Sequence, residues 1–449
     1  MSARSARRAA RAPHGTLAFV ESPVQLLNVL EWAHLSAPPT AAEAASTAAD
    51  AEPAPSSAAG ADFTAADAGA DSTRADAEAE SAAADAEGGS TRADAGAEST
   101  TADAEAESTV ADLTLVVLAP TDPMTRGQLR RMAELARAEG HTVRWEEARG
   151  GTTAPFHTIG GLAGPLRRAA RIVIGDPFSR YVQLLLTITR AQDLVVVDDG
   201  TATMEFISQL ANGERLVRWH RRGGRPGPRD MVFLPVSSSA RRRLTPHPKG
   251  RRRVEVFSSM PIDAAPEGVH VTVNSFAWTR ARFGPPRITK GADLVGTSLV
   301  ETGVVDLDRY LEAVGALART HGAARYFAHR RESAEKLHRL AVETGLQVIR
   351  PDLPLELIAR RGPIGRTILS FPSTVVHTLP LALAGTEVKV AVMDIDPAWL
   401  TDKASPRAQG FLSGVTGTAR DVHRLAALQH PDPAPALPTQ PTRQTPAPA

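Results

Sequence analysis

Short apolar runs rich in valine and isoleucine alternate along the chain with segments that repeat at helical spacing. In one such segment Leu129, Met132, Leu135 and Ala136 fall on one helix face, and Gly140 is placed to end the helix. This alternation predicts an α/β fold with parallel sheets covered by helices on both faces. The apolar runs occupy residues 16–20, 113–118, 171–174, 194–197, 254–257, 270–273, 293–295, 347–349, 367–371 and 388–393.

The alternation falls into two halves, and a repetitive acidic segment interrupts the first. Residues 63–107 form five consecutive nine-residue units, from FTAADAGAD to STTADAEAE, with little apolar content beyond alanine. This composition cannot bury enough surface to offset chain entropy, so it predicts disorder rather than a β-helix. We expect an N-terminal Rossmann-like lobe over 14–265 with a disordered insertion over 37–110, a C-terminal lobe over 266–428, and disordered ends at 1–13 and 429–449.

Composition and charge exclude several classes of function. The 449 residues include no cysteine, which excludes disulfides, thiolate metal sites and thiol nucleophiles and favours a reducing cytoplasm. Neither a transmembrane helix nor a secretory signal is expected from the apolar runs. The insertion at 37–110 carries 16 acidic and 2 basic residues, so the remainder is basic and suits an anionic ligand or surface.

An arginine-rich span runs from Arg215 to Arg253. It contains no recognised nucleic-acid motif, so we expect no nucleic-acid partner. A solvated loop or a membrane-facing loop is the more natural interpretation. The expected location is the cytoplasm, with peripheral contact at the inner face of the cell membrane as the membrane-facing alternative.

Polar residues that directly follow apolar runs are the candidates for chemistry, because ligands of open α/β sheets bind at the carboxyl ends of the strands. Asp198 and Asp199 follow the run 194–197, before a helix expected near Ala202. The pair indicates either a turn with an aspartate cap or a general base whose pKa the neighbouring carboxylate raises. No cluster of further ligands at metal spacing accompanies it, so no metal site is predicted.

Two later motifs suit an anion. In RYFAHRRES (325–333), His329 follows an apolar run and precedes Arg330, which predicts either a phosphate contact or a basic helix start with a solvated histidine. In ILSFPSTVVHTLPLAL (368–383), Ser373 and Thr374 precede an apolar helix. These hydroxyls can cap that helix, and the same helix N-terminus can receive a phosphate.

The stretch FVESPVQLLNVLEW (19–32) is the fourth candidate. Ser22 can cap a helix that has Pro23 at its first position. Gln25, Asn28 and Trp32 would line one stripe of that helix. The stripe is either the polar edge of an apolar face or a set of contacts to a hydroxyl-rich acceptor.

In this order, the Asp-Asp-Gly, the histidine-centred motif and the Ser-Thr pair resemble three motifs of the bacterial sialyltransferases. The similarity is greatest to the lipooligosaccharide sialyltransferase and polysialyltransferase families of glycosyltransferases. ESPVQLLNVLEW (21–32), IGDPFSRYVQ (174–183) and LVGTSLVETGVV (294–305) also look like that group. The resemblance covers residues 16–36 and 111–400, and it departs where the family's His-Pro is His329-Arg330, without the rigid proline.

The resemblance implies a GT-B fold of two Rossmann-like lobes with the active site between them, and inversion without a metal. It implies no cofactor beyond a CMP-activated sugar donor, bound mainly by the C-terminal lobe, and a cell-surface glycan as acceptor. Asp198 or Asp199, of which we favour Asp199, would deprotonate the acceptor hydroxyl, and His329 would stabilise or protonate the leaving phosphate. The residues expected at the donor are Gly200, Arg330, Ser373 and Thr374, and those expected at the acceptor are Ser22, Gln25 and Asn28.

Two alternatives stay open at this level. The same fold could use another nucleotide sugar, or the chain could be a degenerate, non-catalytic protein that binds glycan or a partner through its acidic repeat. The presence of both aspartates, His329 and the Ser373-Thr374 pair argues against the second.

Overall fold

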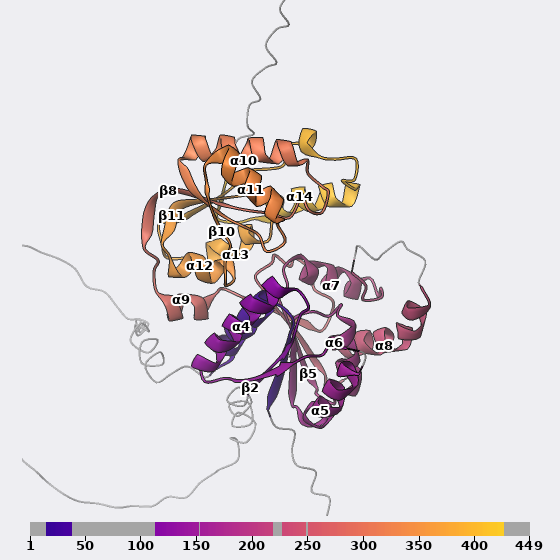
Figure 1. The fold of residues 1–449 in the computed structure, drawn as a ribbon. Coiled ribbons are helices and arrows are strands. Elements are labelled where there is room, and N and C mark those ends of the chain that lie inside the picture. The colour runs from indigo at the N-terminus through magenta and orange to yellow at the C-terminus, as the bar shows by residue number, and fades with distance from the viewer. Residues whose placement is uncertain (1–14, 38–112, 152, 219–226, 248–249, 426–449) are drawn as a thin grey trace, which may run out of the picture. The chain divides into compact units, whose positions relative to one another are not determined.

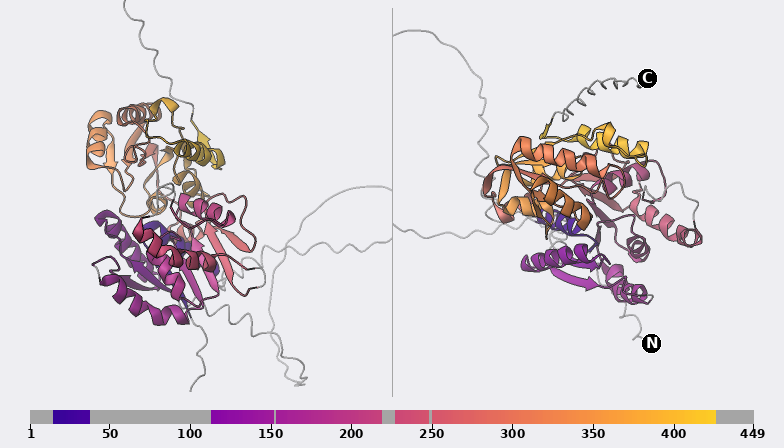
Figure 2. Two further views of the ribbon diagram at one scale, coloured as in Figure 1. Left: turned by 90° about the vertical axis from the view of Figure 1, so that its right-hand side faces the viewer. Right: turned by 45° about the horizontal axis from the view of Figure 1, so that its top comes forward.

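The computed structural model describes residues 15–37, 113–151, 153–218, 227–247 and 250–425 (Figure 1). These residues form two parallel sheets, each between layers of helices, as two further views also show (Figure 2). The predicted α/β, GT-B-like class is therefore confirmed. The terminal segment 1–13, the acidic repeat and the tail 429–449 lie outside the described residues.

In the described N-terminal part, the strands form one parallel sheet in the order β3-β2-β1-β4-β5-β6-β7. Successive side chains of a strand enter opposite cores: Leu194 and Val196 pack on one face, and Val195 and Val197 on the other. Burial on both faces explains the unbroken valine runs. The strands are β1 (Thr16–Val20), β2 (Leu113–Leu118), β3 (Thr142–Glu146), β4 (Arg171–Ile174), β5 (Asp193–Val197), β6 (Arg253–Ser258) and β7 (Val269–Val273).

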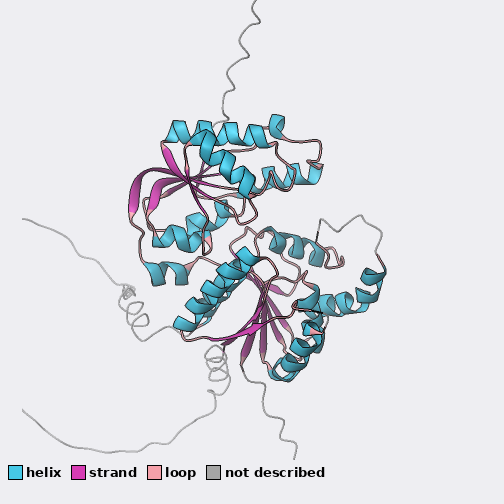
Figure 3. Cartoon of the chain, in the orientation of Figure 1, coloured by secondary structure: helices cyan, strands magenta, loops and turns pink. Residues whose placement is uncertain are grey.

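Helices cover both faces of this sheet (Figure 3). One core holds apolar residues of α1 (Pro23–Ser36), α4 (Pro123–Ala138) and α9 (Ala277–Phe283). The opposite core holds apolar residues of α5 (Ala154–Arg168), α6 (Arg180–Ile188), α7 (Thr201–Ala211) and α8 (Pro228–Leu244). The expected cap of α1 is confirmed, because the Ser22 side chain accepts the Gln25 N–H at 3.2 Å and Pro23 opens the helix.

The described C-terminal part forms a second parallel sheet in the order β10-β9-β8-β11-β12-β13. Helices α10 (Leu307–His321) and α11 (Ala334–Thr344) pack on one face, together with Trp399 of the 3-10 helix η2 (Pro397–Trp399). Helices α12 (Leu355–Arg361) and α13 (Val375–Ala382) lie on the other, and α14 (Pro406–Thr418) packs against α13 through Val415 and Val376. The strands are β8 (Ile288–Val295), β9 (Ala323–Phe327), β10 (Gln347–Ile349), β11 (Ile364–Ser370), β12 (Lys389–Val392) and β13 (Val422–Arg424).

The predicted lobe boundary at residue 266 is wrong. β7 pairs with β6 in register from Val254 with Val269 to Ser258 with Val273, so the first sheet continues past that boundary. The ten apolar runs also omitted β9, of which only the end was recognised before His329, and the pattern missed β3 and β13 altogether. β3 and β13 lie at sheet edges and are only partly buried, so neither needs an unbroken apolar run.

The two sheets share packing around α9 and α12. Buried Glu31 of α1 accepts the N–H groups of Trp278 and Thr279, at 2.8 and 2.9 Å, and so holds the start of α9. Leu353 and Leu357, from the C-terminal part, belong to the same hydrophobic core as α1 and α4. Within the described segments, no helix combines the length and apolar character needed to cross a bilayer.

Candidate functional site

The candidate residues gather at the carboxyl ends of the central strands. β1 lies between β2 and β4, and β8 lies between β9 and β11, so each sheet has a point where its strand order reverses. Open α/β sheets bind ligands at such points. Glu21, Asp176 and Asp198-Asp199 follow β1, β4 and β5 in the first sheet. The His329 and Ser373 loops follow β9 and β11 in the second, on either side of β8.

Asp198 is a structural residue in its contacts. It is 1% exposed, and its carboxylate accepts four hydrogen bonds. The donors are Gly200 N at 2.9 Å, Thr203 Oγ1 at 2.7 Å, and the N and Oγ of Ser259 at 3.2 and 2.8 Å. Burial raises the pKa of Asp198, and the hydrogen bonds from Thr203 and Ser259 offset part of that rise. The saturated carboxylate fixes the turn that carries the next residue.

Asp199 is accessible, and its charge environment is finely balanced. Its side chain is 15% exposed, and its Oδ2 lies 3.2 Å from Arg218 Nη2, which also pairs with Asp176 at 2.7 Å. Burial and then the Asp176 charge raise the pKa of Asp199 to about 7, against the opposing charges of Arg218 and Arg330. The expected rise in the pKa of Asp199 is present, but it comes from burial and from the charge of Asp176, which follows the neighbouring strand β4, rather than from the adjacent Asp198. A carboxylate with this pKa is suited to act as a general base near neutral pH.

The Asp176 charge provides a test of this balance. If Asp199 acts as the base, kcat/KM rises with pH through about 7, because only the ionised carboxylate accepts a proton. Asp176→Asn removes a negative charge that raises the pKa of Asp199. Arg218 then no longer pairs with a second carboxylate besides Asp199, so the pKa of Asp199 falls. The rise in kcat/KM then moves to lower pH, and relative activity at pH ~6 increases several-fold. A midpoint that stays in place, measured from pH ~5 to ~9, would contradict the assignment of the titrating group.

The residues expected at the acceptor divide into two groups. Gln25 is at the site: its Oε1 accepts the Glu21 N–H at 2.8 Å, and a hydrogen bond from its side chain lowers the pKa of Asp199. Asn28 is 2% exposed and structural in its contacts, because its Nδ2 donates to the Asp198 carbonyl at 2.8 Å and its Oδ1 accepts from Asn274. Ser22 is the α1 cap described above. Only Gln25 of the three contacts the carboxylate of Asp199.

Glu21 extends the polar edge beside Asp199. Its Oε1 accepts from Arg149 Nη2 at 2.6 Å and from Ser179 Oγ at 2.8 Å. Burial raises the pKa of Glu21, with Arg149 opposing and Asp176 adding to the rise. The carboxylates, serine hydroxyl and arginines of this cluster offer both hydrogen-bond donors and acceptors.

His329 is a neutral hydrogen-bond donor in its ground state. Its Nδ1 accepts the Arg331 N–H at 3.2 Å, which leaves the ring proton on Nε2. Burial, followed by the charges of Arg330, Arg331 and Lys336, lowers the pKa of His329 to about 4. At neutral pH the ring therefore offers an N–H rather than a full positive charge.

Arg330 supplies positive charge beside Asp199. Its charge acts on Asp199 and on Asp122, the cap of α4, and burial lowers its own pKa. The position that holds proline in the resembling families thus carries a cation whose charge acts on the candidate base.

The Ser373-Thr374 pair does not cap α13 through its side chains. Thr374 is the N-cap residue, but no side-chain capping bond forms, and the Ser373 Oγ lies 3.4 Å from the Ser370 Oγ. Of the two expectations, side-chain capping is not seen, and phosphate binding at this helix N-terminus stays a prediction.

Gly200 brings the first sheet to this helix. It has φ +67°, and a Cβ added there would lie 2.8 Å from the Thr374 Cγ2, so both conformation and space require glycine. The Asp-Asp-Gly turn and the Ser-Thr pair therefore lie in contact.

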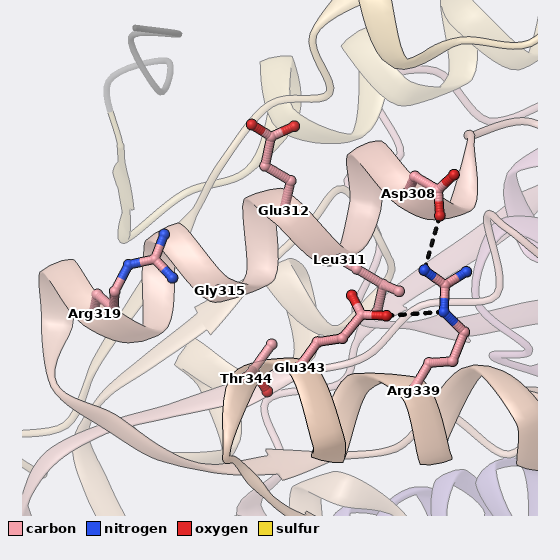
Figure 4. Close-up of a pocket in the computed structure, with 8 residues that line it drawn as sticks. All are labelled: Asp308, Leu311, Glu312, Gly315, Arg319, Arg339, Glu343 and Thr344. Carbon is pink, nitrogen blue, oxygen red and sulfur yellow. Dashed lines mark hydrogen bonds and ion pairs between the residues drawn. The ribbon is translucent and has the colours of Figure 1, made fainter.

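A surface pocket between α10 and α11 is separate from these residues (Figure 4). Its volume is about 240 Å³, and Arg339 within it bonds to Asp308 and Glu343, both at 2.9 Å. None of its lining residues is a candidate from the sequence motifs.

No protein-family model matches the chain, and comparison with curated proteins gives no match. Among solved structures, it is similar to the α/β-galactoside α-2,3-sialyltransferase of Photobacterium phosphoreum at 9% identity and a TM-score of 0.36, over 70% of this chain and 90% of that one. It is also similar to a sialyltransferase of Photobacterium damsela at 10% identity and a TM-score of 0.37, over 92% and 82%. Matches at this level assign neither family nor function, which must come from the residues themselves.

Sequence reasoning missed several charged residues of this region, among them Glu21, which directly follows the apolar run 16–20. Asp176 follows the apolar run 171–174, so the rule that selected Asp198 would also have selected it. Arg218 has no such signal, because a loop brings it to the site. Glu332 and Lys336, discussed below, look like an ordinary helix-surface pair at i and i+4, and only the fold buries them.

Proposed function

We propose that the chain is an inverting glycosyltransferase that transfers sialic acid from a CMP-activated donor to a glycan hydroxyl, without a metal ion. One observation carries the proposal. Asp199, with a pKa of about 7, belongs to the turn whose Gly200 contacts Thr374, and the charge of Arg330 acts on Asp199. A base for an alcohol and groups for a phosphate therefore occur together.

Asp199 accepts the proton of the acceptor hydroxyl as that oxygen attacks the anomeric carbon of the donor. At a pH equal to the pKa of Asp199, about half of the protein molecules carry the ionised carboxylate. Gln25 donates to Asp199, and Glu21 and Asp176 are placed to orient acceptor hydroxyls. The proton passes from Asp199 to solvent after transfer.

The bond between the anomeric carbon and the phosphate oxygen breaks as the new glycosidic bond forms, and CMP leaves with the bonding electrons. The His329 Nε2–H and the N-terminus of α13 stabilise the charge that develops on the phosphate. Arg330 adds a full positive charge. In this proposal these groups supply the stabilisation for which other transferases use a metal ion.

The identity of the donor rests on the order of the three sequence motifs, which resembles the sialyltransferases. We test it by incubating the purified protein with CMP-, UDP- and GDP-sugars and a panel of glycans, with and without a chelator. We expect release of CMP alone, dependent on a glycan acceptor and unaffected by the chelator. Release of UDP or GDP would establish the alternative donor.

The non-catalytic alternative predicts a different result from the same material. A deletion of residues 38–107 should transfer sugar as well as the full chain, because the proposed chemistry uses none of those residues. Absence of nucleotide release from any donor, together with loss of glycan or partner binding on deletion, would favour a binding protein.

A further inference from the structure

A buried polar network lies directly behind the His329 loop. Glu332 is 3% exposed, and its Oε1 accepts from the Tyr326 hydroxyl at 2.6 Å and lies 2.7 Å from the Lys336 ammonium. Lys336 is 1% exposed and lies 4.1 Å from the centre of the Tyr310 ring. The Tyr310 and Tyr326 hydroxyls are 2.8 Å apart, so the network is continuous.

This network binds the backbone of two neighbouring strand-end loops. The second oxygen of Glu332, Oε2, accepts the His329 N–H at 2.6 Å in the loop after β9. Lys336 Nζ donates to the Thr297 carbonyl at 3.0 Å in the loop after β8. Since β8 and β9 are paired, one ion pair joins both loops at the edge where the phosphate is proposed to bind.

The close fit around Glu332 shows that the arrangement is specific. A Cβ added at Gly296 would lie 2.2 Å from the Glu332 Oε2 and 2.5 Å from the Tyr326 hydroxyl. The Gly296 N–H also donates to the Phe327 carbonyl at 2.9 Å. The loop after β8 can approach the carboxylate this closely because it has glycine there.

A buried ion pair contributes little net stability, because desolvation of the two charges offsets their attraction. Its contribution here is to geometry. The His329 N–H is held by a carboxylate while the ring Nδ1 accepts from Arg331, so both the backbone and the ring of His329 are constrained. A proline after the histidine would stiffen the same loop. Residue 330 is instead an arginine.

We propose that Glu332, paired with Lys336, is a positioning residue that holds His329 toward the donor phosphate. The role of His329 in this inference rests on the proposed function. The contact between Glu332 and the His329 N–H does not depend on it. Glu332 touches no substrate in this proposal and acts only through His329.

The test is a double-mutant cycle of Glu332→Gln with His329→Asn. We expect Glu332→Gln to lower kcat roughly 10- to 100-fold, as a small misplacement of a catalytic group does. In the His329→Asn background the same change should have little further effect, because the group it positions is gone. An equal fold-loss in both backgrounds would show a general structural role and overturn the proposal.

Two further variants show whether a loss of activity comes from misfolding rather than from misplacement of His329. Glu332→Gln leaves Lys336 with Glu301, 3.5 Å away, as counter-charge. Combining Glu332→Gln with Lys336→Met removes both charges and should restore the melting temperature but not kcat. Glu335→Gln, on the exposed side of the same helix, is the matched control and should retain wild-type kcat. Full activity in the charge-free pair would also overturn the proposal.

One measurement separates this inference from the proposed function. A hydrogen bond to a carboxylate moves the His329 backbone amide proton signal downfield, and Glu332→Gln should shift it upfield in the absence of any substrate. If the wild-type protein transfers no sugar, the proposed function fails, and the amide signal still reports on the contact. An unmoved signal would show that Glu332 does not hold this N–H.

Discussion

Asp199→Asn is expected to lower kcat/KM for sugar transfer by about 10²- to 10⁴-fold, the usual contribution of a general base. The change is nearly isosteric, and the side chain is partly exposed, so the melting temperature should change little. Initial rates with the donor identified by the nucleotide panel give kcat/KM, and thermal unfolding gives the stability.

Asp198→Asn is the contrasting variant, since it changes the same chemistry one residue away. The Asp198 carboxylate accepts four hydrogen bonds, and an amide nitrogen cannot accept those made to one of its oxygens. Each donor left unsatisfied in the interior costs about 1–3 kcal/mol. We therefore expect Asp198→Asn to lower the free energy of unfolding clearly. A stable Asp198→Asn variant without activity, beside an active Asp199→Asn variant, would reverse the assignment.

His329→Asn is expected to lower kcat by about 10²- to 10³-fold, as loss of a single preorganised donor to a developing charge does. Asparagine suits the test because its amide oxygen can replace Nδ1 as acceptor of the Arg331 N–H and so preserve the turn. It cannot supply an N–H at the position of Nε2. An unchanged kcat at saturating donor would exclude His329 from the leaving-group site.

The titration of His329 gives an independent reading of the same interaction. Burial and neighbouring cations hold the pKa of His329 at about 4 in the free protein. A phosphate placed beside the ring adds negative charge, favours the imidazolium and raises that pKa. The Hε1 signal of His329, followed by NMR between pH ~3 and ~8 with and without CMP, measures the change. A pKa that CMP does not move would place the phosphate elsewhere.

The candidate residues illustrate how far local sequence rules reach. The rule that polar residues after apolar runs face the ligand-binding edge found Asp198, Asp199, His329 and Ser373, because parallel strands place these ends together. It could not rank the two aspartates. Their difference lies in partners distant in sequence: Ser259 saturates Asp198, and Arg218 and Asp176 flank Asp199.

By itself, the sequence determined the alternation of strands and helices, hence the two parallel sheets, and the positions of the strand ends that carry the candidate groups. Those features depend on periodicity and on local capping, as at Ser22. Only the tertiary structure decided which side chains are buried, which lie close enough for their charges to interact, and which only hold other residues in place. Burial and charge proximity set the pKa of Asp199 near 7 and made Glu332 and Lys336 an internal pair. Both effects act through space between segments far apart in the chain, so no local pattern records them.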